Sequence, residues 1–382
     1  MRQHRVLALL LVIFSVVRLE AQSRIPALTT VRDLVIDAAA NDLSPVTWVA
    51  LAGNGTVAIG QAQDHLVRFF DAKGKSLGTF GRDGEGPGEF RRIDRAGWLA
   101  DTLWVSDMSQ PRFTVIGPEH KLLRTVAFAV GMRASERDSN ESVQGFSSLA
   151  LYANGDQLTM GILPALDDPH LPSWAKTKAN TGSRVVLGRV TSAGILLRPV
   201  AYTPFDQCGL DMSPLSKLCQ RPIAEIGPNG DRVVMAVAAT SGAELGTFQV
   251  VVISQAGDTI FARRFPFKAE QIDAHVRDSL TALAAAGPRP PQMRGMVSER
   301  PSPRIYPPLK RLVIGRDGTV WVELRVTGAG RPYLVLDPKG NAIGMATLPA
   351  NVTLMAANRT TIWATQRDAD DVESVVRFRV GS

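Results

Sequence analysis

Three carboxylates stand where acid-base or metal chemistry could be built. Asp94 and Glu225 each fall in a short apolar segment that we expect to form the innermost strand of a repeated unit, and Glu323 falls in a second strand. Carboxylates that converge from neighbouring strands can bind a divalent cation or serve as a general acid and base. A solvated or hydrogen-bonded structural role is the alternative for each of them.

The histidines are too dispersed to add imidazole ligands to these carboxylates. We expect His65 on a third strand, His120 in an outer turn, His170 in a loop and His275 on a helix. A zinc site needs three or four converging ligands, and the sequence holds no Gly-x-Ser-x-Gly nucleophile motif. We therefore assign no catalytic residue, no metal ligand and no cofactor, and we favour a protein that is not an enzyme.

The glycine-rich run FGRDGEGPGEF, from Phe80 to Phe90, could be mistaken for a phosphate-binding loop. Such a loop needs a helix N-terminus directly after it, whereas strands are expected here, and no Gly-Lys-Ser/Thr ending is present. We expect a connection between two repeated units. Its charged residues Arg82, Asp83 and Glu85 are candidates for binding a partner at the entrance of a channel.

One unit recurs six times along the chain. It consists of a short apolar strand, a turn that usually contains Gly, Asn or Asp, and a second strand that often begins with Thr. The second strands begin at Thr56, Thr102, Gln157, Arg232, Thr319 and Thr361. Because a second hairpin follows in most copies, each unit holds four strands, as does a blade of a β-propeller.

The two ends of the repeat array complement each other. The sixth copy stops after its third strand, Val375 to Val380, and a strand without a unit of its own, Leu34 to Ile36, precedes the first copy. Pairing these two strands would remove exposed sheet edges. We therefore predict an all-β fold: a six-bladed β-propeller over residues 30–382, with the N-terminal strand closing the last blade and one inserted helix.

Two insertions interrupt the array, at about residues 203–222 and 266–308. The second carries apolar residues at helical spacing, at Ile272, Val276, Leu280 and Leu283. They predict an amphipathic helix packed on the propeller, and the prolines after it predict an extended loop. Arg304 and Tyr306, near the end of that loop, are further candidate binding residues.

The N-terminus and the two cysteines indicate export. Arg2 and Arg5 precede an apolar run too short to span a bilayer, so residues 1–21 are expected to be a cleaved signal peptide, with no membrane span afterwards. Cys208 and Cys219 are expected to form a disulfide in the oxidising periplasm or outside the cell. The formal net charge of +7 is too modest to indicate nucleic-acid binding.

The glycine-rich run, followed by Leu103-Trp104-Val105-Ser106-Asp107 and by Arg112-Phe113-Thr114-Val115, resembles the NHL-type repeat. More closely, it looks like the bacterial six-bladed propeller family related to NHL proteins. In the first unit Gln61 and Leu66 stand where the second has Asp107 and Arg112, so this pair is not repeated. The resemblance implies a fold and no single activity.

Three functions stay open at this point. We favour a non-catalytic binding or scaffold propeller, a monomer whose partner is a protein or a small-molecule ligand. A metal-dependent lyase or hydrolase would need axial ligands, and a sugar- or polymer-binding module would need exposed aromatics at one channel mouth. Five tryptophans fall on inner or second strands, where packing between blades is the simpler role: Trp48, Trp98, Trp104, Trp321 and Trp363.

Overall fold

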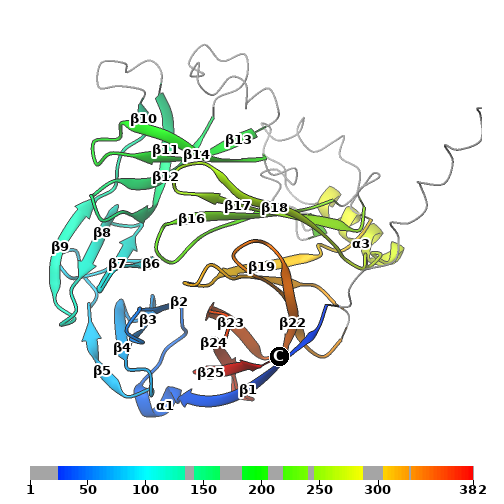
Figure 1. The fold of residues 1–382 in the computed structure, drawn as a ribbon, viewed down its shortest axis with the longest axis horizontal. Coiled ribbons are helices and arrows are strands. Elements are labelled where there is room, and N and C mark those ends of the chain that lie inside the picture. Colours follow the sequence, from blue (N-terminus) through cyan, green and yellow to red (C-terminus); the bar gives the residue numbers. More distant parts are fainter. Residues whose placement is uncertain are drawn as a thin grey trace, which may run out of the picture.

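The computed structural model describes residues 25–133, 142–163, 183–204, 218–239, 245–286, 304–326 and 328–381. The described chain is nearly all β-structure in a propeller arrangement, with the sheets placed in a ring and the strands β2, β6, β19 and β23 toward its middle (Figure 1). Among these residues, no helix is long and apolar enough to cross a membrane.

Three sheets have four antiparallel strands each, in chain order. The first contains β2 (Trp48–Leu51), β3 (Val57–Gln61), β4 (Leu66–Phe70) and β5 (Ser76–Phe80). The second contains β6 (Ile93–Leu99), β7 (Thr102–Asp107), β8 (Arg112–Ile116) and β9 (Leu122–Ala127). The third of this kind contains β15 (Ile223–Ile226), β16 (Arg232–Ala238), β17 (Thr247–Ser254) and β18 (Thr259–Pro266).

The remaining strands form two larger sheets. One has five strands: β10 (Met132–Arg133), β11 (Ser142–Leu151), β12 (Gln157–Ile162), β13 (Ser183–Val190) and β14 (Leu196–Pro204). The other has eight, in the order β19 (Leu309–Ile314), β20 (Val320–Leu324), β21 (Arg331–Leu336), β22 (Ala342–Leu348), β1 (Ala27–Ile36), β25 (Glu373–Gly381), β24 (Thr361–Arg367) and β23 (Val352–Ala357).

Second strands are buried on both faces, because each sheet packs against a neighbour on either side. Every residue of β3 is buried, and β7 is buried from Leu103 to Asp107. Outer strands such as β9 are mostly exposed. The hairpin turns depend on glycine where φ is positive, as at Gly55 with φ 89° and Gly318 with φ 81°, because a side chain there would be strained.

The N-terminal strand pairs as predicted. In β1, Val35 lies opposite Val376 and Ile36 opposite Val375 of β25. The structure adds a second contact that the sequence did not suggest: Ala27 and Leu28 pair in parallel with β22, which joins the two halves of the eight-stranded sheet. Both chain ends are therefore held in one sheet.

At a bulge in β1, ion pairs stabilise the pairing of β1 with β25. The register shifts between Arg32 and Leu34, and the carboxylate of Asp33 at that point accepts bonds from Arg377 at 2.9 Å and Arg379 at 2.6 Å. These guanidinium groups hold the pKa of Asp33 below its usual value, chiefly through the hydrogen bond from Arg377.

Two details of the predicted helical content were wrong. A second helix, α1 (Ala38–Asn41), follows β1 directly; the Asp37 carboxylate accepts from the Ala40 amide at 2.8 Å and caps it. The inserted helix exists as α3 (Ala274–Ala286), but it does not pack as an amphipathic helix should: Val276 is 36% and Leu283 58% exposed, while the buried Ile272 lies before it.

Candidate functional site

A cavity of about 470 Å³ lies at the centre of the ring. It is lined by residues of β2, β6, β11, β15, β19 and β23, the first long strand of each repeated unit, by Trp104 of β7, and by the turns that follow β15 and β19. Ligand sites are usually concave, with a few polar groups converging on a mostly apolar wall, and this size falls within their common range. The cavity is therefore the candidate site.

The charged groups of this cavity come from three units and are partly paired. Asp94 and Arg95 stand on β6, Glu225 on β15 and Arg311 on β19, with Arg316 just after β19. Arg95 reaches across to Glu225 at 3.3 Å, which joins two strands far apart in sequence. Asp94 accepts from the Met108 amide and from Arg92, both at about 3 Å in the structure.

A backbone contact joins two of the elements that line the cavity. The turn after β15 reaches β6, where the Trp98 amide donates to the Pro228 carbonyl at 3.1 Å. Gly97 permits this approach: a Cβ at that position would lie 2.7 Å from the same carbonyl oxygen and 2.6 Å from the Trp104 ring. The contact holds β6 against the turn after β15.

Connections between sheets lie on the face of the ring where the inner strands begin. In a four-stranded antiparallel sheet the last strand ends on the side where the first began, so each link to the next inner strand lies on one face. The glycine-rich run connects β5 to β6 in this way, as predicted, and leads through Arg91 and Arg92 into the cavity residue Asp94.

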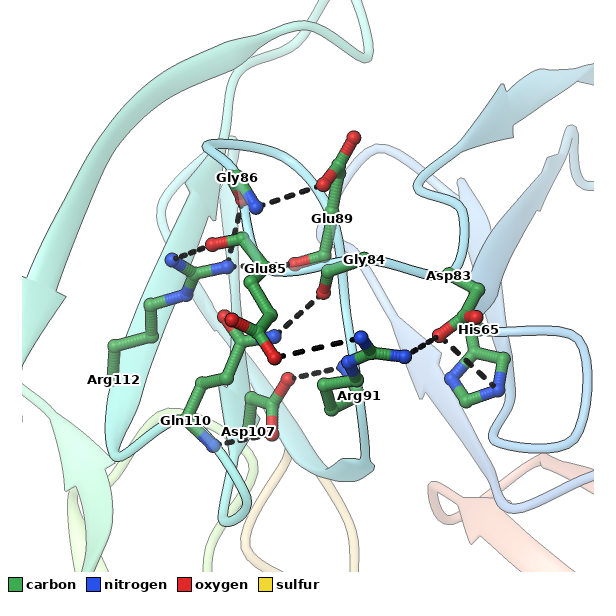
Figure 2. Close-up of polar contacts among 10 residues, drawn as sticks. All are labelled: His65, Asp83, Gly84, Glu85, Gly86, Glu89, Arg91, Asp107, Gln110 and Arg112. Carbon is green, nitrogen blue, oxygen red and sulfur yellow. Dashed lines mark hydrogen bonds and ion pairs between the residues drawn. The ribbon is translucent and has the colours of Figure 1, made fainter.

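The glycine-rich run is a tightly bonded loop (Figure 2). Arg112 donates to the carbonyls of Glu85, Gly86 and Glu89 at 2.8 to 3.1 Å. Gln110 donates to the Gly84 carbonyl at 2.6 Å, and the buried Asp107 carboxylate accepts from the Arg91 amide at 2.7 Å. Asp107, Gln110 and Arg112 therefore hold the loop's backbone in place.

The candidate binding residues of this loop lie close to one another but are engaged with neighbours. Arg91 bridges Asp83 at 3.0 Å and Glu85 at 3.4 Å, and His65 approaches Asp83 at 3.8 Å (Figure 2). Arg82 pairs with Glu89 at 2.6 Å while its side chain stays 78% exposed. They form an exposed cluster of paired charges, in which Arg82 has the most exposed side chain.

Arg304 and Tyr306 do not join that cluster. They form one side of the stem of the second insertion, where the Ile272 amide donates to the Arg304 carbonyl and the Tyr306 amide to the Glu270 carbonyl, each at 2.9 Å. Arg325 lies 4.1 Å from the centre of the Tyr306 ring. Tyr306 thus anchors the insertion, and the exposed Arg304 side chain remains a candidate contact.

The other residues of interest take structural positions. Glu323 is buried and accepts from Arg331 at 2.8 Å and from the Tyr333 hydroxyl at 3.0 Å. Among the described histidines, His120 stacks on Phe69 at 3.9 Å, His275 lies on α3, and His65 lies in the turn before β4, not on the third strand as predicted. His170 and Cys208 lie outside the described residues.

Sequence reasoning missed Arg95, Arg311 and Arg316. The signal was present: each stands in or next to an otherwise apolar first strand of a repeat, the same place where Asp94 and Glu225 were noticed. Metal-ligand and nucleophile patterns do not include arginine, so neither pattern points to these three residues. Within the described part of the chain, no group of three or more His, Cys, Asp or Glu side chains is placed to hold a metal ion.

Comparisons with known proteins give distant likenesses of overall structure. No family model and no curated protein matches the chain. A solved structure of a DUF4221 family member from Bacteroides vulgatus is 9% identical, with a TM-score of 0.48 over 93% of this chain and 98% of that one. A putative exported protein from Bacteroides fragilis is 11% identical, with a TM-score of 0.48 over 93% and 95%.

Virginiamycin B lyase from Staphylococcus aureus is also among the solved structures that match. It is 10% identical, with a TM-score of 0.43 over 92% of this chain and 99% of that one. None of these likenesses is close enough to transfer an activity, so the candidate function is argued from the cavity of this chain.

Proposed function

We propose that this protein is a non-catalytic binding propeller that takes a small-molecule ligand into its central cavity. The observation that carries the proposal is the convergence of charged side chains from several units on one cavity of about 470 Å³. Because these side chains stand on paired strands, little conformational entropy is lost when a ligand binds. The exposed charged side chains of the glycine-rich loop form the second proposed contact region.

The proposal includes six blades. The eight-stranded sheet divides naturally into β19 to β22 and a second unit of β23 to β25 completed by β1, with the short pairing of Ala27 and Leu28 as a seam between them. With the other four sheets, this division gives each of the six sequence repeats its own unit of four or five strands.

The protein is proposed to act as a monomer in the periplasm or outside the cell. The proposed location rests on the signal-like segment at residues 1–21 and on the expected disulfide between Cys208 and Cys219. Mass spectrometry of the protein recovered from the cell envelope should show an N-terminus near Ala21. The Cys208 and Cys219 peptides should be linked until a reductant is added.

Tryptophan fluorescence offers a direct test of binding, since Trp48 and Trp104 both line the cavity. A panel of small polar metabolites should include at least one that changes the emission and raises the melting temperature. Metal analysis of the purified protein serves as the control on the class of function. A stoichiometric ion held by cavity carboxylates would favour the lyase or hydrolase alternative instead.

A further inference from the structure

Two arginines of the cavity have no acidic partner. Arg311 donates from Nη1 to the Leu354 carbonyl of β23 at 2.7 Å, and Arg316 donates from Nη1 to the Leu51 carbonyl of β2 at 3.0 Å. Within the described part of the chain, neither guanidinium lies within ion-pairing distance of a carboxylate. Both side chains are partly buried.

The remaining cavity charges are already compensated. Arg95 is paired with Glu225, and Asp94 with Arg92. Burial lowers the pKa of Arg316, and the charge of Asp231 raises it by a smaller amount. The Asp231 carboxylate is itself bonded to Arg232 at 2.6 Å. The excess positive charge of the cavity therefore belongs to Arg311 and Arg316.

Burial of an uncompensated charge is costly, and a guanidinium cannot remove that cost by losing its proton. Arg311 is held through Nη1 by the Leu354 carbonyl and the Met355 sulfur, and Arg316 through Nη1 by the Leu51 carbonyl. Within the described part of the chain, the other N–H donors of both groups have no partner. A planar guanidinium fixed in this way matches the paired oxygens of a carboxylate or a phosphate. The cavity thus holds two preformed anion contacts.

We propose that the ligand of the cavity is a small anionic molecule, bound through carboxylate or phosphate oxygens by Arg311 and Arg316. This rests on the function proposed above and specifies its ligand class. Arg311 lies in the first half of β19 and Arg316 follows its end, so the two contacts lie at different depths of the cavity. An elongated ligand with an anionic group toward each end would engage both.

The test is calorimetric titration of the whole exported protein at low ionic strength. Inorganic phosphate, acetate and succinate are the anionic probes, and glucose is a neutral one. Each anion that binds should lose affinity by about tenfold or more in Arg311→Gln and in Arg316→Gln, because a charge-assisted hydrogen bond is removed. Succinate should bind more tightly than acetate if both arginines engage one ligand.

Arg124→Gln is the matched control. Arg124 is an exposed residue of the outer strand β9 and lies outside the cavity, so the same loss of charge there should leave anion affinity unchanged. Circular dichroism and the melting temperature establish that each variant folds. If a variant fails to fold, Arg311→Lys or Arg316→Lys keeps the charge and should restore part of the affinity.

The outcomes separate the two proposals. Equal anion affinity in the wild type and in the Arg311→Gln, Arg316→Gln double variant would overturn the anion site. If no anion binds but a neutral compound changes the fluorescence of the cavity tryptophans, the anion site is again refuted while the binding propeller stands. If neither kind of compound binds, both proposals fail. Phosphate binding without carboxylate binding, or the reverse, identifies the chemical source of the anion.

Discussion

At the scale of single residues, two arginine side chains of the glycine-rich region have different roles. The three carbonyls that Arg112 holds belong to a segment without regular secondary structure, whose backbone would otherwise depend on water. Arg82 stands in the same loop and pairs only with a carboxylate at the surface. The same residue type thus has a structural role at one position and an accessible one at the other.

We predict that Arg112→Ala lowers the free energy of unfolding by about 1–3 kcal/mol, because charged donors to several backbone carbonyls are lost together. Arg82→Ala is the control from the same loop and should leave stability unchanged. Urea denaturation of both variants is the measurement. Equal stabilities for the two would show that Arg112 does not hold the loop.

His120 makes stability depend on pH. Its ring stacks on Phe69, and burial lowers the pKa of the imidazole from its ordinary 6.5, against a smaller opposing effect of a backbone hydrogen bond at Leu77. The unfolded chain therefore binds the proton more readily than the folded one. This contribution to stability is fully present above about pH 6.5 and is lost as the pH falls toward the lower folded value.

The substitution His120→Phe keeps an aromatic ring on Phe69 but removes the titration. We predict that the free energy of unfolding of this variant, relative to that of the wild type, increases as the pH is lowered from 7.5 to 5. Urea denaturation at each pH is the measurement. A difference between the two proteins that stays constant over this range would refute the role of His120.

At the scale of elements, the position of β6 depends on a contact that leaves no room for a side chain. Gly97 lies between the Trp104 ring and the Pro228 carbonyl, and the Trp98 amide donates to that carbonyl. A backbone carbonyl cannot rotate away as a flexible side chain can. The strand is therefore held against the turn after β15.

Gly97→Ala should destabilise the protein by about 1–3 kcal/mol through overpacking, and it should also weaken ligand binding because β6 carries Asp94 and Arg95. Gly53→Ala is a matched control, since the nearest atom to a new Cβ there is the end of the Arg316 side chain at 3.4 Å. Thermal unfolding compares the two. A melting temperature for Gly97→Ala as high as that of the control would contradict the close contact.

At the scale of the whole molecule, stability depends on the joining of the two chain ends. The β1 and β25 pairing closes the ring of sheets, and Asp33 bonds both Arg377 and Arg379 from the bulge of β1. Cooperative unfolding should therefore begin where this pair separates, since β1 and β25 come from opposite ends of the chain, whereas most neighbouring strands of a sheet follow one another in sequence.

Asp33→Ala is expected to lower the free energy of unfolding by about 1–2 kcal/mol and to increase hydrogen exchange at the amides of β25. Asp370→Ala removes the same charge from an exposed turn and should change neither quantity. Hydrogen exchange read by mass spectrometry reports on the two ends of the chain separately. Unchanged exchange of the β25 peptides in Asp33→Ala would show that the ion pairs of Asp33 do not stabilise this pairing.

The sequence by itself determined the repeat, its turns and the strand that closes the array. These features are local: glycine and asparagine permit positive φ at hairpin turns, and a strand left without partners at each end of the array can be recognised from the chain order. The helix at α3 was also found by its spacing, but its packing was predicted wrongly because periodicity does not say what lies opposite an apolar face.

Only the tertiary structure decided which side chains meet in the cavity. Arg95 and Glu225 come from different sheets and are 130 positions apart, and the carbonyl that steadies Arg311 belongs to β23. Local propensity places each of these residues on a strand but carries no information on which other strand it faces. That pairing depends on the closure of the whole ring, and among the described residues it leaves Arg311 and Arg316 without an acidic partner.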